Sequence, residues 1–479
     1  MPHRLGIVPN TLYYGDNLDV LPRIATESVD LIYLDPPFKS DAQYNVLFRT
    51  SRGDPSSAQI HAFGDTWKWS LEAESALHTL TTSPSIQPDL TTFIRAMFQI
   101  LGKSDMMAYL AMMAPRLVEM RRVLKPTGTI YLHCDQTAGH YLKLLMDKVF
   151  GVTNFRNEII WYYNSGARKK SDFGKRHDTI FRYSKSDDYF FDDGEVRVPY
   201  SPDINIPASK AHYYDPRGKV MDDVWRIPII PQNDKHERLG YPTQKPLALL
   251  DLIVRSSCPM GGVVLDPFCG CGTAVDAAQQ VQRRWVGIDI AYIAIDLIRN
   301  RLVGRYGKDV LKTFSLDGIP QDFEGADALA ESNKIDFERW AVSLVKGQPT
   351  KASGDEGVDG KIYFARTYKE PLDVGTCVVS VKGGDNLYPG MVRDLAGTVS
   401  GSGAQMGLLI TRVEPTEGMK SEASKHGSYI HEATGALYPV LQILTTSQLL
   451  DEVQPKIPSP LPPYQQATWA PDSVAVPLF

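Results

Sequence analysis

The segment 261–290, GGVVLDPFCGCGTAVDAAQQVQRRWVGIDI, limits the possible folds more than any other part of this sequence. The apolar residues 263–265 predict a buried strand, and residues 273–282 predict a helix. A second apolar strand is expected at 285–288. A strand, a helix and another strand in this order are typical of a parallel sheet covered by helices. The sequence therefore predicts an α/β fold.

Two acidic residues and two glycines stand at the ends of these strands. Asp266 ends the first strand, Gly270 and Gly272 shape the loop, and Asp289 ends the second strand. Glycines let a ligand approach the backbone, and an acidic residue here can accept hydrogen bonds from ribose hydroxyls. Val275 stands where a dinucleotide fingerprint has its third glycine. The loop alone is therefore compatible with a nucleotide-like ligand, a dinucleotide or a purely structural turn.

A further acidic strand end lies in LIYLDPPFKS, where the apolar run 31–34 predicts a strand that stops at Asp35. The Asp35 carboxylate and the backbone carbonyl of Pro36 are hydrogen-bond acceptors only. Amino groups of nucleobases are donors, and binding to both acceptors would favour a tetrahedral nitrogen with a usable lone pair. Pro36 and Pro37 stiffen the loop, and Phe38 is suited to stack on an extruded base.

The rest of the first half continues the α/β pattern. A long helix is expected at 105–126, with a kink at Pro115, followed by a strand at 129–135 and a helix at 138–150. Between about 152 and 240 the pattern gives way to short strands, turns and charged residues. This change predicts an insertion carried by the sheet.

Three motifs together resemble the exocyclic-amino DNA methyltransferases that use S-adenosylmethionine: DPPF, FCGCGT, and GYPTQKP at 240–246. The catalytic motif precedes the cofactor motif, which is similar to the beta arrangement of that family. The resemblance covers roughly residues 11–315. It implies a Rossmann-like methyltransferase domain over 1–317, with a target-recognition region inserted at about 152–240. The catalytic residues that it implies are Asp35, Pro36, Pro37 and Phe38. The implied cofactor-side residues are Asp16, Thr243, Lys245, Asp266, Phe268, Gly270, Gly272, Thr273 and Asp289.

This resemblance implies an enzyme that methylates adenine N6 at a specific site in duplex DNA, within a restriction–modification or related system. Aspartate rather than serine at position 35 favours adenine, and cytosine N4 stays open. Methylation of RNA or of a protein glutamine would use the same acceptor chemistry, and a non-catalytic DNA-binding protein could keep the fold. The intact Asp-Pro-Pro and glycine loops favour the enzyme.

A basic segment lies inside the expected insertion. Residues 166–185 hold seven Lys or Arg and two Asp, with aromatic residues between them, while the whole chain has a net charge of -5. Positive charge for DNA must therefore be local, and lysines and arginines here would neutralise phosphates. The alternative is a solvated surface loop with a strand behind it. The expected DNA contacts are Arg168, Lys169, Lys170, Lys175 and Arg176.

A second domain is expected at 335–452, after a connecting segment at 318–334. A helix, a turn into a strand and a second strand resemble the Mrr-like branch of the restriction-endonuclease fold, a smaller α/β unit. The tail, 453–479, is rich in proline and shows no helical or strand period. We expect it to be extended or disordered.

The resemblance implies a metal-dependent nuclease site in this second domain. Asp359 would hold Mg²⁺, with Lys382 on the adjacent strand and Glu338 as a further candidate. Ser380 stands where such sites have an acidic residue or glutamine, and a hydroxyl is a poor replacement ligand. A bifunctional methyltransferase–endonuclease and an inactive DNA-binding domain therefore both stay open.

Composition narrows the setting. The longest apolar runs are far shorter than a membrane span, and the N-terminus lacks the apolar core of a signal peptide. The five cysteines are too scattered for a disulfide framework, and no Cys/His pattern with zinc spacing accompanies Cys269 and Cys271. We therefore expect a cytoplasmic protein that binds double-stranded DNA. The sequence leaves open a homodimer or a separate restriction partner.

Overall fold

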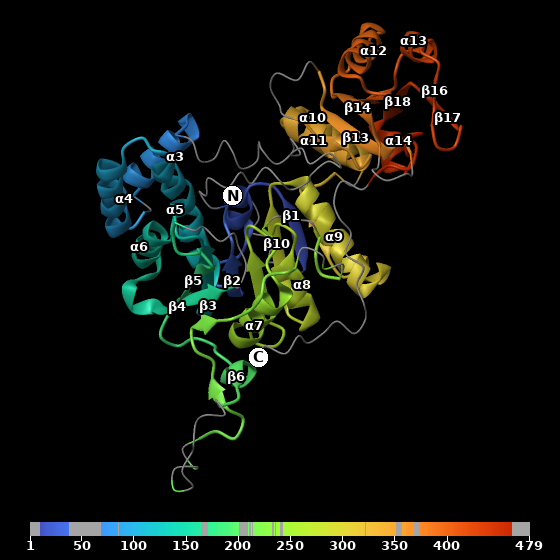
Figure 1. Ribbon diagram of the computed structural model, residues 1–479. Coiled ribbons are helices and arrows are strands. Elements are labelled where there is room, and N and C mark those ends of the chain that lie inside the picture. The colour runs from blue at the N-terminus through green and yellow to red at the C-terminus, as the bar shows by residue number, and fades with distance from the viewer. Residues whose placement is uncertain are drawn as a thin grey trace.

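The computed structural model describes residues 10–37, 69–84, 86–163, 171–200, 209, 212, 214–231, 234, 236–239, 243–320, 322–350, 357–367 and 373–461. Within these ranges the chain forms a larger N-terminal and a smaller C-terminal α/β unit (Figure 1). None of the helices described is long and apolar enough to cross a membrane.

The larger unit is built on a nine-stranded sheet. Its strands lie in the order β11 (Ser315–Asp317), β1 (Thr11–Tyr14), β10 (Arg284–Asp289), β9 (Val263–Asp266), β2 (Val29–Leu34), β3 (Leu124–Cys134), β5 (His177–Ser184), β4 (Phe155–Tyr162) and β8 (Val224–Trp225). β5 runs antiparallel to its two neighbours, and the other neighbouring pairs are parallel. The order of the strands along the chain changes direction between β9 and β2. Open α/β sheets bind ligands beyond the carboxyl ends of the strands at such a point.

Helices cover both faces of this sheet (Figure 1). One face carries α1 (Asn17–Val20), α3 (Leu71–Thr82), α4 (Pro88–Leu101), α5 (Asp105–Val123) and α6 (Gly139–Phe150), and the other carries α7 (Leu247–Ser257), α8 (Thr273–Gln280) and α9 (Tyr292–Tyr306). Alternate residues of β2 enter the two cores: Leu31 and Tyr33 lie in one, and Ile32 and Leu34 lie in the other. This division follows from the two-residue period of a strand, and it makes β2 buried along its whole length.

The long helix predicted near the middle of the unit runs through Pro115 and ends at Val123, because β3 begins at the next residue. Trp69, on the segment before α3, packs its ring 5.6 Å from that of Phe98 and lies under the ammonium group of Lys103. Both contacts brace the helical layer rather than a base-binding surface.

Parts of the region expected as an insertion, 152–240, belong to the central sheet, and these parts include β8 near its end. Residues 155–184 hold β4 and β5, which are full strands of the central sheet rather than part of an appended region. Without β5, the N–H and C=O groups along one edge of β3 would be unpaired. The antiparallel β5 pairs with them and so belongs to the sheet. Ile180 and Phe181 are buried on opposite faces of that strand. The remaining part carries the short β6 (Arg197–Val198) and β7 (Lys219–Val220), in an arm that extends away from the sheet (Figure 1).

The smaller unit has a five-stranded sheet in the order β12 (Gln348–Pro349), β13 (Gly360–Ala365), β14 (Val374–Lys382), β15 (Met406–Thr411) and β18 (Leu441–Thr445). Its helices are α11 (Lys334–Leu344), α12 (Gly390–Ser402), α13 (Glu417–Ser424) and α14 (Thr446–Leu450), and β16 (Ser428–Ile430) pairs with β17 (Leu437–Pro439) in a separate hairpin. β13 and β14 are antiparallel, whereas β14, β15 and β18 are parallel.

The connecting segment is more structured than the sequence predicts, and the beginning of the tail is packed. The connecting segment contains α10 (Phe323–Ser332). Its N-cap is Asp322, whose carboxylate accepts a hydrogen bond from the Gly325 N–H. In the tail that was expected to be extended or disordered, residues 453–461 pack against the smaller unit. Ile457 is buried there, and the N–H of Leu461 donates to the carbonyl of Tyr363 at 2.8 Å. An extended segment can satisfy the backbone of a neighbouring strand without any period of its own.

Candidate active site

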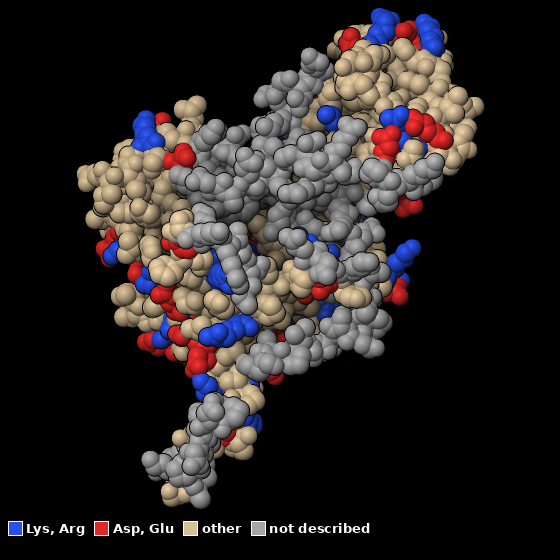
Figure 2. All heavy atoms as spheres, in the orientation of Figure 1, with Lys and Arg blue, Asp and Glu red and all other residues tan. Residues whose placement is uncertain are grey.

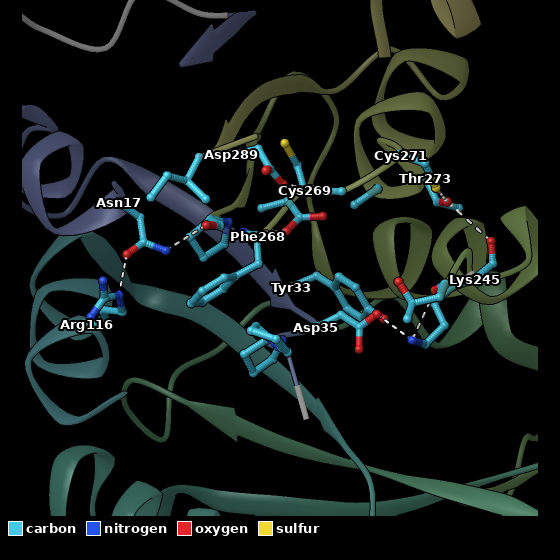
Figure 3. A pocket seen from close by; sticks show the side chains of 18 of the residues that line it. Asn17, Tyr33, Asp35, Arg116, Lys245, Phe268, Cys269, Cys271, Thr273 and Asp289 are labelled. Carbon is cyan, nitrogen blue, oxygen red and sulfur yellow. Dashed lines mark hydrogen bonds and ion pairs between the residues drawn. The ribbon is translucent and has the colours of Figure 1, made fainter. Parts of the chain in front are cut away.

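A pocket opens at the carboxyl ends of β1, β10, β9 and β2 (Figure 3). The space between its walls, open mouth and adjoining solvent included, is about 1150 Å³. The predicted residues that line it are Asp16, Asp35, Pro36, Pro37, Thr243, Lys245, Asp266, Phe268, Gly270, Thr273 and Asp289. Segments far apart in the sequence therefore converge on one cavity.

The glycine loop has the conformation that its sequence requires. Gly270 and Gly272 have φ angles of 49° and 75°, in the left-handed region that favours glycine. A Cβ on Gly272 would lie 2.5 Å from Cγ1 of Ile298, so a larger residue would also collide with α9. Gly270 borders the cavity, whereas Gly272 is not among the residues that line it and lets the loop pack against α9.

Asp289 holds this loop from the neighbouring strand. Its Oδ2 accepts a hydrogen bond from the Gly270 N–H at 2.8 Å, and its Oδ1 accepts one from the Ala291 N–H at 2.8 Å. Burial raises the pKa of the Asp289 carboxyl to about 6. Burial also raises the pKa of Asp266 well above its ordinary value, with the charges of Asp35 and Asp289 adding to the effect. A cationic ligand would relieve this crowding of carboxylates.

Asp16 belongs to a polar chain that ties α1 and α5 to the loop after β9. Arg116 contacts both carboxylate oxygens of Asp16, at 2.7 and 2.8 Å, and donates from Nε to Asn17 Oδ1 at 2.6 Å. Asn17 in turn donates to the carbonyl of Pro267 at 2.8 Å. Arg116 and Asn17 line the pocket, and sequence reasoning missed both (Figure 3). The helical pattern around Arg116 gives no signal of this contact, whereas Asn17 directly follows a predicted site residue.

Lys245 reaches the acceptor carboxylate instead of pointing only to the cofactor side. Its ammonium group forms an ion pair with Oδ2 of Asp35, and the two side chains are 10% and 15% exposed (Figure 3). The backbone carbonyl of Lys245 accepts a hydrogen bond from the Thr273 hydroxyl at 3.3 Å. The first residue of α8 therefore fixes the segment that carries this lysine.

A buried ion pair braces the same corner from behind. Arg301 on α9 donates from Nε to Asp276 Oδ2 at 2.7 Å, and both side chains are fully buried. Arg301 also donates to the Thr273 hydroxyl at 3.1 Å and to the backbone carbonyl of Cys271 at 3.3 Å. The orientation of the glycine loop thus depends on α9 as well as on its own glycines.

Three polar residues that sequence reasoning missed lie beside Asp35. The hydroxyl of Tyr33 is 3.0 Å from Nδ1 of His133, and Nε2 of His133 is 3.2 Å from Oδ2 of Asp178. They come from β2, β3 and β5, and the ring of Tyr33 lines the pocket. Only their positions at the ends of apolar strands could have drawn attention to them.

Several other predicted residues lie at the margin or outside the description. Phe38, Arg168, Lys169 and Lys170 fall outside the described residues. Lys175, which is exposed, and Arg176 directly precede β5. On the face in Figure 2, lysines and arginines alternate with acidic residues over the described surface. Cys269 and Cys271 are buried in the glycine loop, and burial raises the pKa of both thiols.

The predicted nuclease residues meet at the start of β13 and the end of β14. Asp359 lies opposite Ser380, and its Oδ2 accepts hydrogen bonds from the Val381 N–H at 2.6 Å and the Ser380 hydroxyl at 3.3 Å. Burial raises the pKa of Asp359 and, together with the charge of Asp359, raises the pKa of Glu338 on α11. Lys382 acts on both carboxylates through its charge. Across the described ranges, no three His, Cys, Asp or Glu residues cluster as a metal site.

Two parts of the chain match families of known proteins. Residues 29–300 match the sequence model of a family described as DNA methylase, and residues 329–431 match one described as restriction endonuclease. Type II methyltransferase M.HpaI of Haemophilus parainfluenzae is 33% identical over 189 residues, covering 39% of this chain and 57% of that protein. DNA adenine methyltransferase YhdJ of Escherichia coli (strain K12) is 27% identical over 320 residues, covering 65% of this chain and 89% of that protein. The solved PvuII DNA methyltransferase (cytosine-N4-specific) aligns with 15% identity and a TM-score of 0.39, over 65% of this chain and 96% of that one.

Proposed function

Because this chain belongs to the DNA methylase family, we propose that it moves a methyl group from S-adenosylmethionine to adenine N6 at a specific sequence in duplex DNA. One observation carries the proposal. The acceptor residues Asp35 and Pro36 share a single pocket with the glycine loop and Asp289, at the point where the strand order reverses. A methyl donor and an amino acceptor can therefore meet there.

The residues of the pocket fit S-adenosylmethionine. Gly270 borders the cavity, and the carboxylate of Asp289 is suited to accept from ribose hydroxyls. The buried Asp266 suits a ligand with a cationic sulfur, because a nearby positive charge would favour the ionised form of its carboxyl. When bound, the cofactor supplies a methyl group on a sulfonium sulfur. The chain itself supplies the binding geometry and the acceptors.

The acceptor residues prepare the target amino group. One amino hydrogen would bond to the Asp35 carboxylate and the other to the Pro36 carbonyl, which directs the nitrogen lone pair into the pocket. Pro37 keeps this loop stiff, and Phe38 is proposed to stack on the extruded base. Lys245 compensates the charge of Asp35 while the two side chains are largely withdrawn from water. The arriving amino group takes a place beside that ammonium group or displaces it.

Adenine is favoured over cytosine by aspartate at position 35, and the similar YhdJ protein is named a DNA adenine methyltransferase. The test is to express the chain in a host that lacks base methylation and to sequence the modified bases in its DNA. We expect N6-methyladenine within one recurring sequence, and none with Asp35→Ala. Detection of N4-methylcytosine instead would make cytosine the target base. Unmodified DNA from well-folded protein would refute the proposal.

A second activity, metal-dependent DNA cleavage, is proposed for the smaller unit. Asp359, Glu338 and Lys382 lie close enough for their charges to act on one another, and this part matches a restriction-endonuclease family. The donors nevertheless do not fit a tightly held Mg²⁺. Oδ2 of Asp359 is already engaged by Ser380 and Val381, and Ser380 offers no carboxylate or amide oxygen. We therefore propose weak cleavage at most.

A further inference from the structure

The chain of polar residues next to Asp35 has no role in the chemistry described so far. Tyr33, His133 and Asp178 come from three neighbouring strands and are joined by contacts of 3.0 and 3.2 Å. At the far end, Tyr163 donates from its hydroxyl to Oδ1 of Asp178 at 3.2 Å. Tyr33 and His133 are almost completely buried. Polar groups are costly to bury, so aliphatic residues would fill this space more favourably.

The ionised state of Asp178 sets the direction of its hydrogen bonds. Burial alone would raise the pKa of Asp178, but the hydrogen bond and the charge of His133, the charge of Lys245 and the hydrogen bond from Tyr163 outweigh it, so the net pKa is lowered. The carboxylate can only accept, so Nε2 of His133 carries the proton that points to it. The other ring nitrogen, Nδ1, shares a hydrogen bond with the hydroxyl of Tyr33, in which the hydroxyl can donate or accept. The phenol is thereby held in one orientation.

Tyr33 connects this chain to the reacting group. It lies two residues before Asp35, and both residues line the pocket. Its ring lines the pocket, whereas His133 is fully buried and cannot touch a substrate. Lys245, the ion-pair partner of Asp35, also acts on Asp178 through its charge. The polar chain is thus connected to the Asp35 carboxylate in two ways: through the backbone between Tyr33 and Asp35, and through the ammonium group of Lys245.

We propose that Tyr33, His133 and Asp178 are positioning residues for methyl transfer, which fix the end of β2 so that Asp35 and Pro36 hold the target amino group at the reactive angle. The inference rests on the proposed methyltransferase function. It assigns no substrate contact to His133 or Asp178. Small errors of placement at a reacting group can cost up to about a hundredfold in rate, so a rigid support behind the acceptors is valuable.

Two single variants and their combination test this role. Tyr33→Phe removes one hydroxyl, and Asp178→Asn replaces one acceptor oxygen by an amide. Each should lower the single-turnover methyl-transfer rate constant by about tenfold to a hundredfold. Dissociation constants for S-adenosylmethionine and duplex DNA should stay within about twofold, because neither change removes a ligand contact. The double variant should be no slower than the slower single variant, since both act through one chain.

The matched control is Tyr131→Phe. Tyr131 is another buried tyrosine of the same sheet, and its hydroxyl lies 2.7 Å from that of Ser257, outside the polar chain. The rate constant of Tyr131→Phe should stay near that of the natural chain. Its loss of thermal stability should be similar to that of Tyr33→Phe. Multiplying effects in the double variant, or an equal slowing by Tyr131→Phe, would overturn the inference. If the natural chain itself fails to methylate DNA, the proposed function fails instead, so the two failures are distinguishable.

Discussion

The ammonium group of Lys245 and the carboxylate of Asp35 form an ion pair although 210 positions separate them in the sequence. Lys245 stands in the segment before α7, and Asp35 directly follows β2. The carboxylate that is proposed to receive a base amino group is therefore already bound to a cation of the protein. This arrangement orders the carboxylate before substrate arrives and supplies a donor that the substrate must share or replace.

Removing this counter-ion should slow methyl transfer. We expect Lys245→Met to lower the single-turnover rate by about tenfold or more, because an unpaired buried carboxylate loses its fixed orientation and its compensation. Lys245→Arg should keep more activity than Lys245→Met. Rapid-quench measurements with labelled S-adenosylmethionine would show the difference. Equal rates for Lys245→Met and the natural chain would mean that the pair is incidental.

Loss of the acceptor itself should be more severe. Asp35→Ala withdraws one of the two acceptors for the amino group and should reduce methyl transfer by at least about a hundredfold, as removal of a preorganised charge-stabilising group does elsewhere. Circular dichroism should show an intact fold, because Asp35 lies beyond the strand and outside both cores. Near-normal methylation by this variant would remove the acceptor from the mechanism.

Cofactor affinity should depend on pH through Asp289. Its pKa is raised to about 6, and the ionised carboxylate is the better acceptor for ribose hydroxyls. As the pH falls below about 6 the group binds a proton, so the dissociation constant for S-adenosylmethionine should rise by up to about tenfold per pH unit. Above that pH this contribution should be flat.

Calorimetric titrations between pH 5 and 8 would measure this effect. Asp289→Asn should bind the cofactor more weakly at pH 7.5, and its pH slope should be smaller by one proton. Any slope that remains would come from other groups, with Asp266 the first candidate because its pKa is also raised. An identical slope in Asp289→Asn would contradict the assignment, and tight binding of NAD by the natural chain would overturn the choice of cofactor.

The basic segment should contribute to DNA binding through phosphate contacts. Changing Lys169 and Lys170 to Gln should reduce the log–log slope of DNA affinity against salt by up to about 1.8, since each phosphate contact adds about 0.9. The matched control changes Lys308 and Lys312, which are exposed beyond the end of α9, between that helix and the first residue of β11. Equal slopes for the two double variants would favour the alternative of a solvated surface loop with β5 behind it. Cofactor affinity should not change in either variant.

The smaller unit should cut DNA slowly or not at all. Ser380→Gln should raise Mg²⁺- or Mn²⁺-dependent cleavage of unmethylated duplex DNA, because a side-chain amide oxygen would face the metal where the hydroxyl now bonds Asp359. Lys382→Ala is the control that should abolish cleavage. Strong cutting by the natural chain, lost in that control, would show that Ser380 is no handicap. If Ser380→Gln is also inactive, a DNA-holding role is the better explanation.

Domain organisation was only partly accessible from the sequence. The change in pattern near residue 152 predicted an insertion, but β4, β5 and β8 are strands of the central sheet. Short apolar runs with interspersed charge look alike in an inserted arm and in an antiparallel strand. The connecting segment likewise hides α10, which has a modest apolar face and one fully buried alanine, Ala326. Contacts with residues that are distant in the sequence decide which structure such segments adopt.

The sequence by itself determined the local parts of this protein: strands that end in Asp35, Asp266 and Asp289, and a loop that needs glycine at 270 and 272. The spacing of apolar residues encodes the strands, and the backbone angles of the loop require glycine, so each feature is specified within a few residues. Only the tertiary structure placed Lys245 on Asp35, Arg116 on Asp16, and His133 between Tyr33 and Asp178. Those contacts depend on which strands are neighbours and in what register. Many strand orders are compatible with the same local patterns, and burial of both faces of the sheet selects one of them.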